Sequence, residues 1–443
     1  MSAMNSNIPR AASAALTIGL WLLIAAALFR IAAGEQYQWD LRVFHAAPAA
    51  LENGENPYDN TAPGVNIPST LSYLYPPIVL YVFKPLADLS YSAAHLAWFA
   101  IKILALVSLL VLWHRHFERL GGSWPIVLFF LFAFKSTLLR DITAGNIAIL
   151  EQLGLWTGFY LILKRRPYMA GAILALTAQV KLMPVVFLGL LLICGPTRGW
   201  KPFLTSLAIF AGLFSLNYVF MPEMSNHYLQ SFASNNPNLD ERGEINPCSL
   251  AMLRDVAAVI SDFGIPMSPS LVNALYFLYA GVFGCAILFV LFKYEDQLRS
   301  VDSKLLMYVA CVLFALIMPR VKDYTYIILL IPALFVLRRI DVRPLVPVLG
   351  ILVFLPPTDS YVPGLGNAFI SWLQSYMPWI IAWVLLYYLA REIWRAGTAR
   401  RSDQGAPEPT RDIAMALQQD DASKRGPLAE PRVRTGTRAL RSV

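Results

Sequence analysis

The feature that most constrains this chain is a series of apolar runs, most of them close to the ~20 residues that a helix needs to cross a bilayer. Of the 443 residues, 57% are hydrophobic and only 14% are charged, whereas a soluble domain carries about 25% charged residues. Because a backbone inside lipid must satisfy its own hydrogen bonds, helices are the expected elements. We therefore predict an all-α polytopic membrane protein.

The apolar runs predict about twelve transmembrane helices. They cover residues 13–33, 93–113, 124–139, 147–163, 168–179, 183–194, 202–221, 271–292, 305–318, 325–337, 345–356 and 379–393. The first run is too long for the apolar core of a signal peptide, so we expect an uncleaved first helix. A further run, residues 78–89, is interrupted by Lys84 and Pro85 and predicts a re-entrant or interfacial helix.

Lysine and arginine residues are concentrated in alternate short loops, and loops of this kind stay cytoplasmic. They predict a multi-pass protein of the plasma (inner) membrane with both termini in the cytoplasm. The opposite, extracytoplasmic face then receives a first outer loop, residues 34–77, and a second large outer loop, residues 222–270. The net charge of +8 comes largely from these topology signals, so we expect no nucleic-acid partner.

The end of the chain differs in composition from the rest. Residues 396–443 are polar and rich in Arg, Asp, Pro and Gln, without hydrophobic periodicity, which predicts a disordered cytoplasmic tail. Residues 1–395 would then form the transmembrane domain. The four cysteines have no CxxC spacing and the histidines no metal-ligand spacing, so we expect neither a disulfide framework nor a metal site.

Asp40 follows the first apolar run by only a few residues, which places it near the membrane surface at the start of the first outer loop. With an ordinary pKa of about 3.9, its carboxylate is ionised at neutral pH and can accept a proton from a hydroxyl group. The alternative is a solvated loop residue or an ion-pair partner of Arg42. Position in the sequence alone leaves both interpretations open.

The same loop contains two turn-forming segments, Asn56-Pro57-Tyr58 and Tyr75-Pro76-Pro77. Proline restricts the backbone, and tyrosine is favoured at the bilayer interface. We expect these segments to shape the loop, with an aromatic wall for a sugar as the alternative.

Several charged residues lie inside or at the ends of the apolar runs: Lys135, Arg140, Asp141, Lys181, Arg320, Lys322 and Asp323. A lysine or arginine at mid-bilayer costs about 2.5–3.5 kcal/mol, so such residues usually face a cavity or a partner. Lys181 precedes Pro184, which indicates either a functional cation or a helix break with a snorkelling amine. Together with Arg320 and Lys322, it could hold a lipid-linked phosphate.

The ordered set of residues 40–44, Asn56-Pro57-Tyr58, Tyr75-Pro76-Pro77, Gly145-Asn146, and Lys181 with Pro184 resembles family 87 of the GT-C glycosyltransferases. That family is typified by polyprenol-phosphate-mannose-dependent mannosyltransferases. The resemblance runs from the first apolar run to about residue 340. It implies a GT-C-type fold, with residues 1–395 as the transmembrane catalytic domain.

The resemblance also implies roles for individual residues. Asp40 would be the catalytic base, and the phosphate of a polyprenyl-phosphate sugar would be held by Lys181, Arg320, Lys322 and Arg140. The substrate loops would present Arg42, Asn56, Tyr58, Tyr75, Asn146 and Tyr324. Two departures bear on the identity of the sugar: Asn146 stands where many members carry Gln, and the turn after Pro319 lacks a His associated with mannosyl-transferring relatives.

The expected activity is the inverting transfer of a hexose, with mannose favoured, from the lipid-linked donor to an envelope glycolipid or polysaccharide on the extracytoplasmic face. Fixed cations can stabilise the leaving phosphate, so no cofactor is required and a divalent metal is optional. The alternatives are a lipid or solute transporter, whose charged residues would line a path, and a non-catalytic scaffold for polysaccharide assembly.

Overall fold

The computed structural model describes residues 10–59, 73–121, 123–195, 198–233, 243–294, 301–339 and 365–405. These residues form helices joined by irregular segments, and no strand occurs among them, which confirms the all-α prediction for this part of the chain. Residues up to Ile393 form one compact unit, and a second unit begins at Trp394. Of the second unit, only the helical stretch that ends at Gly405 is described.

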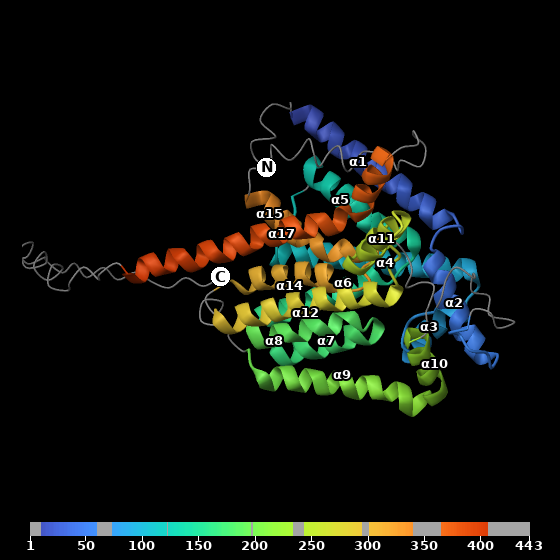
Figure 1. The fold of residues 1–443 in the computed structure, drawn as a ribbon. Helices are drawn as coiled ribbons and strands as arrows, with labels where there is room; N and C mark the ends of the chain where they lie inside the picture. Colours follow the sequence, from blue (N-terminus) through green and yellow to red (C-terminus); the bar gives the residue numbers. More distant parts are fainter. Residues whose placement is uncertain are drawn as a thin grey trace, which may run out of the picture. The chain divides into compact units, whose positions relative to one another are not determined.

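The helices are labelled in Figure 1. The chain begins with α1 (Arg10–Ala33), α2 (Trp39–Glu52), α3 (Ile78–Ala87), α4 (Tyr91–His116) and α5 (Trp124–Ala144). It continues with α6 (Ala148–Leu163), α7 (Pro167–Val180), the 3-10 helix η2 (Met183–Gly189), α8 (Leu190–Ile193) and α9 (Trp200–Phe220). The remaining elements are α10 (Pro222–Ala233), α11 (Ser249–Asp262), α12 (Pro269–Lys293), α14 (Ser303–Ile317), the 3-10 helix η4 (Asp323–Leu329), α15 (Leu330–Arg339) and α17 (Leu365–Gly405).

Five helical stretches among the described residues are long and apolar enough to cross a membrane: Ala11–Ala33, Tyr91–His116, Trp200–Phe220, Pro269–Leu291 and Ser371–Arg395. The apolar segment of α1 has no buried residue in its most apolar stretch. A helix that exposes apolar side chains on all sides is stable in lipid but not in water. The protein is therefore embedded in a membrane.

Helix length and hydropathy identify five candidate spans among the described residues, fewer than the expected number of about twelve. The runs at 147–163, 168–179, 183–194 and 305–318 form shorter apolar helices, and the run at 345–356 lies outside the described residues. The run at 124–139 lies in α5, where a break with left-handed backbone at Phe134, Lys135 and Ser136 divides the helix. The count of twelve therefore remains a prediction.

Helix α7 packs against both α6 and α9. The contact between α7 and α9 needs a small residue, because a Cβ at Gly171 would overlap the Ser206 side chain. Small residues of this kind let helices approach closely inside a membrane, where van der Waals packing rather than the hydrophobic effect holds them together. On α6, Trp156 is fully buried and meets the Trp113 ring edge-on at 5.7 Å.

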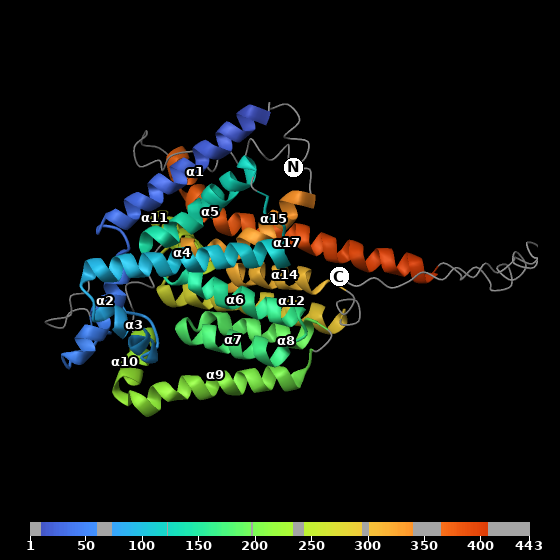
Figure 2. The same ribbon diagram turned by 180° about the vertical axis from the view of Figure 1, so that it is seen from behind.

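The predicted first outer loop contains a helix, α2. Helix α2 packs against α3, and the rings of Phe44 and Phe83 stack at 4.2 Å between them. Within the predicted run 78–89, the short helix α3 (Ile78–Ala87) contains Pro85, and its re-entrant or interfacial position remains a prediction. Figures 1 and 2 place α2, α3 and α10 at the same end of the unit. The two long segments that the sequence assigned to one face thus both contribute helices to this end.

Candidate active site

Asp40 lies in the first turn of α2, and its side chain is partly buried. Its partner comes from a distant segment: Asn146 donates a hydrogen bond from Nδ2 to the Oδ2 atom of Asp40 at 2.6 Å. Arg42 instead donates to the backbone oxygen of Glu35 at 3.1 Å and lies 5.9 Å from the centre of the Tyr91 ring. Asp40 is thus neither a solvated loop residue nor the partner of Arg42.

Gly145 allows Asp40 and Asn146 to meet. It ends α5 with a left-handed φ of 71°, a conformation that glycine adopts without strain. A Cβ at this position would lie 2.8 Å from the Cα atom of Gln38, and the Gln38 N–H donates to the Thr143 carbonyl at 2.6 Å. The residue that precedes α2 is therefore docked directly on the end of α5.

Lys181 is the second charged partner of Asn146. Helix α7 ends at Val180 and Lys181 is extended, so the predicted helix break is present. Its Nζ atom donates to Asn146 Oδ1 at 3.2 Å and forms an ion pair with Glu151 Oε2 at 3.0 Å. One orientation of the Asn146 amide thus satisfies both neighbours, since its NH2 group donates to the carboxylate and its oxygen accepts from the ammonium.

The turn after Pro319 brings further cations to the same site. The Val321 N–H donates to Asn246 Oδ1 at 2.8 Å, and the Asp323 N–H donates to the Ile245 carbonyl at 3.2 Å. Residues of the predicted second large outer loop, residues 222–270, therefore hold this turn in place. The ammonium groups of Lys181 and Lys322 lie 5.5 Å and 6.0 Å from the centre of the Tyr324 ring, within the range of a cation–π contact.

Tyr75 also reaches Asn146, whose Nδ2 atom lies 3.5 Å from the Tyr75 hydroxyl oxygen. The Tyr58 hydroxyl donates to the Tyr75 carbonyl at 2.8 Å, and the Tyr58 N–H donates to Asn56 Oδ1 at 3.0 Å. Asn56 and Tyr58 thus form a turn that supports Tyr75, as the turn signals predicted.

The electrostatic surroundings of Asp40 favour a proton-accepting role. Burial raises the pKa of Asp40 above its ordinary value of 3.8, because the charged carboxylate is less well solvated. The opposing influences are weaker: attraction to Lys322, the hydrogen bond from Asn146, and attraction to Lys102 and Lys181. A carboxylate with a raised pKa holds an abstracted proton more strongly than a solvated one.

Tyr75 remains a neutral phenol in these surroundings. Burial raises its pKa well above the ordinary value of 10.0, and the negative charge of Asp40 raises it further. The positive charge of Arg320 acts in the opposite direction, so Arg320 lies within electrostatic range of Tyr75. A neutral hydroxyl can both donate and accept a hydrogen bond.

Arg140 forms an ion pair with Asp323, which follows this turn. Its Nη1 atom is 2.7 Å from Asp323 Oδ2, and the arginine side chain is 49% exposed whereas that of the aspartate is 5% exposed. The Asp323 carbonyl accepts a hydrogen bond from Thr137 at 2.8 Å. Among the cations that the sequence assigned to a phosphate, Lys181 and Lys322 act on Asp40, and Arg140 acts on Asp323.

Two charged residues of this cluster were missed in the sequence. Lys102 forms an ion pair with Asp141, Nζ to Oδ2 at 2.7 Å, and neither side chain is exposed to solvent. Glu151, the partner of Lys181, is 5% exposed. The available signal was a charged residue in each of the apolar runs 93–113 and 147–163, a pattern that usually marks a function or a buried partner.

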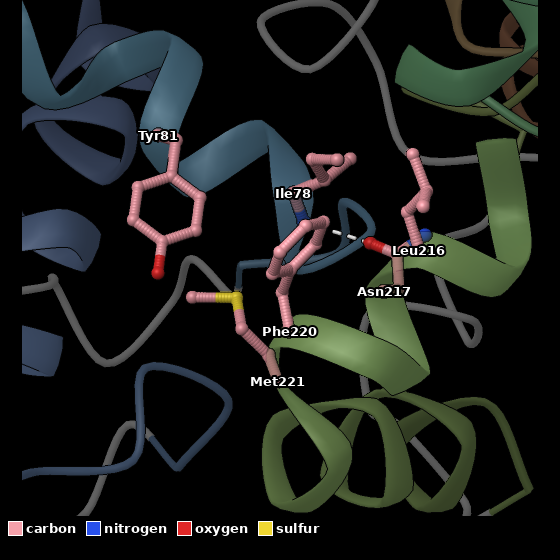
Figure 3. A pocket seen from close by; sticks show the side chains of 6 residues that line it. All are labelled: Ile78, Tyr81, Leu216, Asn217, Phe220 and Met221. Carbon is pink, nitrogen blue, oxygen red and sulfur yellow. Dashed lines mark hydrogen bonds between the residues drawn. The ribbon is translucent and has the colours of Figure 1, made fainter.

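A largely apolar groove lies between α3 and α9. Figure 3 shows its lining residues, Ile78, Tyr81, Leu216, Asn217, Phe220 and Met221. The Ile78 N–H donates to Asn217 Oδ1 at 2.8 Å, which fixes the start of α3 against α9. Ile78 directly follows Tyr75-Pro76-Pro77 in the chain.

The helices and the polar cluster together define a polytopic membrane protein in which polar side chains from the ends of several helices form one site. The sequence profile of glycosyltransferase family 87 matches residues 73–319. The chain belongs to glycosyltransferase family 87 and is a membrane glycosyltransferase, which confirms the predicted family and enzyme class. The curated proteins contain no match to the chain.

The matched segment contains some of the candidate site residues and not others. Tyr75, Asn146 and Lys181 lie inside it, whereas Asp40 precedes it and the turn that begins at Arg320 follows it. Within the described ranges, no three His, Cys, Asp or Glu side chains gather in a way that could hold a metal ion. That the reaction requires no cofactor and that a divalent metal is optional remain predictions.

Proposed function

We propose that this glycosyltransferase moves a hexose from a polyprenyl-phosphate sugar to an envelope glycolipid or polysaccharide acceptor, with mannose as the first sugar to test. The transfer is a single displacement with inversion on the extracytoplasmic face of the plasma membrane. The observation that carries the proposal is the Asp40–Asn146–Lys181 network. It joins a carboxylate and an ammonium group through the two ends of one amide.

In this reaction Asp40 accepts the proton of the acceptor hydroxyl as the hydroxyl oxygen attacks the anomeric carbon. The bond between that carbon and the phosphate oxygen breaks, and its electron pair remains on the polyprenyl phosphate. Asp40 then releases the proton to solvent. The raised pKa of Asp40 supports this role, as does its partly exposed position in the first turn of α2.

The departing phosphate gains negative charge in the transition state, and fixed cations stabilise that charge. Lys181 and Lys322 are both held near the Tyr324 ring, and Arg320 lies in the same turn as Lys322. We assign these three cations to the phosphate. Arg140, paired with Asp323, would contribute from behind the turn.

Tyr75 is assigned to the substrate, because its hydroxyl group lies beside Asn146. Asn56 and Tyr58 keep its segment in place, and we assign Arg42, which is exposed on α2, to the acceptor. The groove between α3 and α9 (Figure 3) suits the polyprenyl chain, since its lining is mostly apolar and one lining residue, Ile78, follows Tyr75-Pro76-Pro77 in the chain.

The decisive experiment supplies the purified protein with polyprenyl-phosphate mannose and a membrane glycolipid extract. Wild-type protein should transfer the sugar, and Asp40→Asn should lower the rate by about 10²–10⁴-fold, the usual contribution of a general base. Asp88→Asn is the matched control, because Asp88 pairs with Lys84 at an exposed position. Equal transfer by Asp40→Asn and wild type would remove Asp40 as the base. If the wild type used no lipid-linked sugar, the donor class would be wrong.

The side of the membrane is tested separately by cysteine labelling in intact cells. Cys285 is exposed, so it is first replaced in a Cys285→Ser background. Asn53→Cys then introduces a thiol at the exposed end of α2. An impermeant maleimide should label this thiol from outside. Labelling only after the cells are opened would overturn the proposed topology.

A further inference from the structure

The ion pair between Lys102 and Asp141 lies within the helices, out of contact with solvent. The two charged atoms are 2.7 Å apart, and both side chains are fully buried. Burying two charges has a large desolvation cost, and a well-packed apolar pair of similar volume is often at least as stable. In a membrane span, such residues usually serve a function. Stability alone is therefore a poor explanation for this pair.

The ammonium group of Lys102 has three oxygen neighbours. Besides its ion pair with the Asp141 carboxylate, it donates hydrogen bonds to the backbone carbonyls of Asp141 and Asn146, each at 2.5 Å. All three oxygens belong to the segment that ends α5 and carries Asn146.

Helix α4 holds this segment at a second point. Trp98, one turn before Lys102, donates from Nε1 to the Gly145 carbonyl at 2.7 Å. Residues four apart lie on the same face of a helix, so Trp98 and Lys102 together fix the successive carbonyls of Gly145 and Asn146. The backbone of Asn146 has little freedom to move as a result.

The position of that backbone determines the position of the Asn146 amide. Its Nδ2 atom donates to Asp40 at 2.6 Å, and its Oδ1 atom accepts from Lys181 at 3.2 Å and from the Ala148 N–H at 3.1 Å. A shift of the backbone would weaken all three bonds, because hydrogen bonds weaken steeply with distance and angle.

We propose that Lys102 is a positioning residue of the transferase: it fixes Asn146 through its backbone carbonyl, and thereby holds Asp40 in place while its charge favours the Asp40 carboxylate. This inference rests on the proposed role of Asp40 as base. Lys102 itself touches no substrate, because it is fully buried.

Asp40 has charged or titratable neighbours on several elements: Lys102 on α4, Asp141 on α5, Lys181 after α7, Lys322 before η4, Glu151 on α6, Tyr75 before α3 and Tyr324 on η4. Lys181 and Lys322 are assigned to the donor, so replacing either would alter substrate binding together with Asp40. Lys102 is fully buried. Its replacement therefore changes the surroundings of Asp40 without removing a contact to the donor.

The test follows the titration of Asp40 without a sugar donor. Dicyclohexylcarbodiimide reacts with protonated carboxyl groups in apolar surroundings, and the adduct on the Asp40 peptide can be measured by mass spectrometry across a pH series. Lys102→Met should raise the pH midpoint of this modification by about one unit, because a cation that favours the carboxylate has been removed. Lys84→Met is the matched control and should leave the midpoint unchanged, since Lys84 pairs with acids at an exposed position.

Lys102→Met leaves Asp141 buried without its cation and can fail to fold, so the double variant Lys102→Met/Asp141→Leu is measured beside it. The double variant should fold, and because the cation and the acid that it removes act on Asp40 with opposite sign, it should show a smaller rise of the midpoint that comes from the loosened Asn146 hydrogen bond, with kcat for mannose transfer lowered more than KM is changed. A wild-type midpoint in the folded double variant would reduce the pair to a structural role and overturn the proposal. Absence of transfer by wild-type protein would count against the proposed donor, while the midpoints would still decide the role of Lys102.

Discussion

Two lysines contact Asn146, one at its backbone carbonyl and one at its side-chain amide, and the surroundings of the two lysines differ sharply. Lys102 reaches the backbone carbonyl and pairs with Asp141, and both side chains of that pair are fully buried. Lys181 reaches the amide oxygen and pairs with Glu151, and its side chain is 23% exposed. The same kind of ion pair is thus closed to solvent where it lies between helices and partly open to solvent where a helix ends.

The largest expected effect is on stability, which should differ between variants of the two lysines. Lys102→Met should destabilise the protein by about 3–5 kcal/mol, because it leaves a buried carboxylate without its partner. Lys181→Met should have a smaller effect, since Lys181 is partly accessible to solvent. Denaturant titration in detergent micelles measures both. Equal losses would show that the difference in burial has no energetic consequence.

The next largest effect is expected on the transfer rate, where Lys181 should matter more than Lys102. Lys181→Met should lower kcat by about 10²–10³-fold, the usual result of removing one electrostatic contact from a developing negative charge. Lys181→Arg keeps the charge and should retain part of the rate. Initial rates with polyprenyl-phosphate mannose provide the measurement. A change confined to KM would place Lys181 in ground-state binding instead.

A smaller effect concerns the pH dependence. Because burial raises the pKa of Asp40 above 3.8, Asp40 is protonated and inactive on the acid side, and the transfer rate should rise as pH increases through the raised pKa. Asn146→Leu removes a hydrogen bond to the carboxylate, so the acid limb of the rate profile should move upward by about one pH unit. An acid limb that stays in place would show that Asn146 does not act on Asp40.

The smallest effect is expected for a lysine far from both pairs. Lys84 forms ion pairs with Glu52 and Asp88 at the surface, where such pairs contribute little to stability. Lys84→Met should therefore leave both unfolding and transfer at wild-type values. A clear loss of transfer would show that the surface ion pairs of Lys84 matter for activity and would weaken the assignment of function to the buried charges.

Several features of the site could be predicted because they depend on neighbouring residues. The break of α7 at Lys181 follows from the nearby Pro184, and the turn at Asn56 follows from Asn-Pro-Tyr, which has its own local hydrogen bond at 3.0 Å. Asp40 was predicted from its place after the first apolar run. Its function as a base remains a prediction, since the structure gives its surroundings and not its chemistry.

The sequence by itself determined that this chain lies in a membrane, because the scarcity of charge and the length of its apolar runs leave no other stable environment. It also determined which polar residues need an explanation. Only the tertiary structure decided which of them meet: Asp40 and Asn146 are 106 positions apart, and Lys102 and Asp141 are 39 apart. Contacts at such separations depend on how helices pack, and the energy of that packing is spread over many side chains rather than encoded in any local pattern.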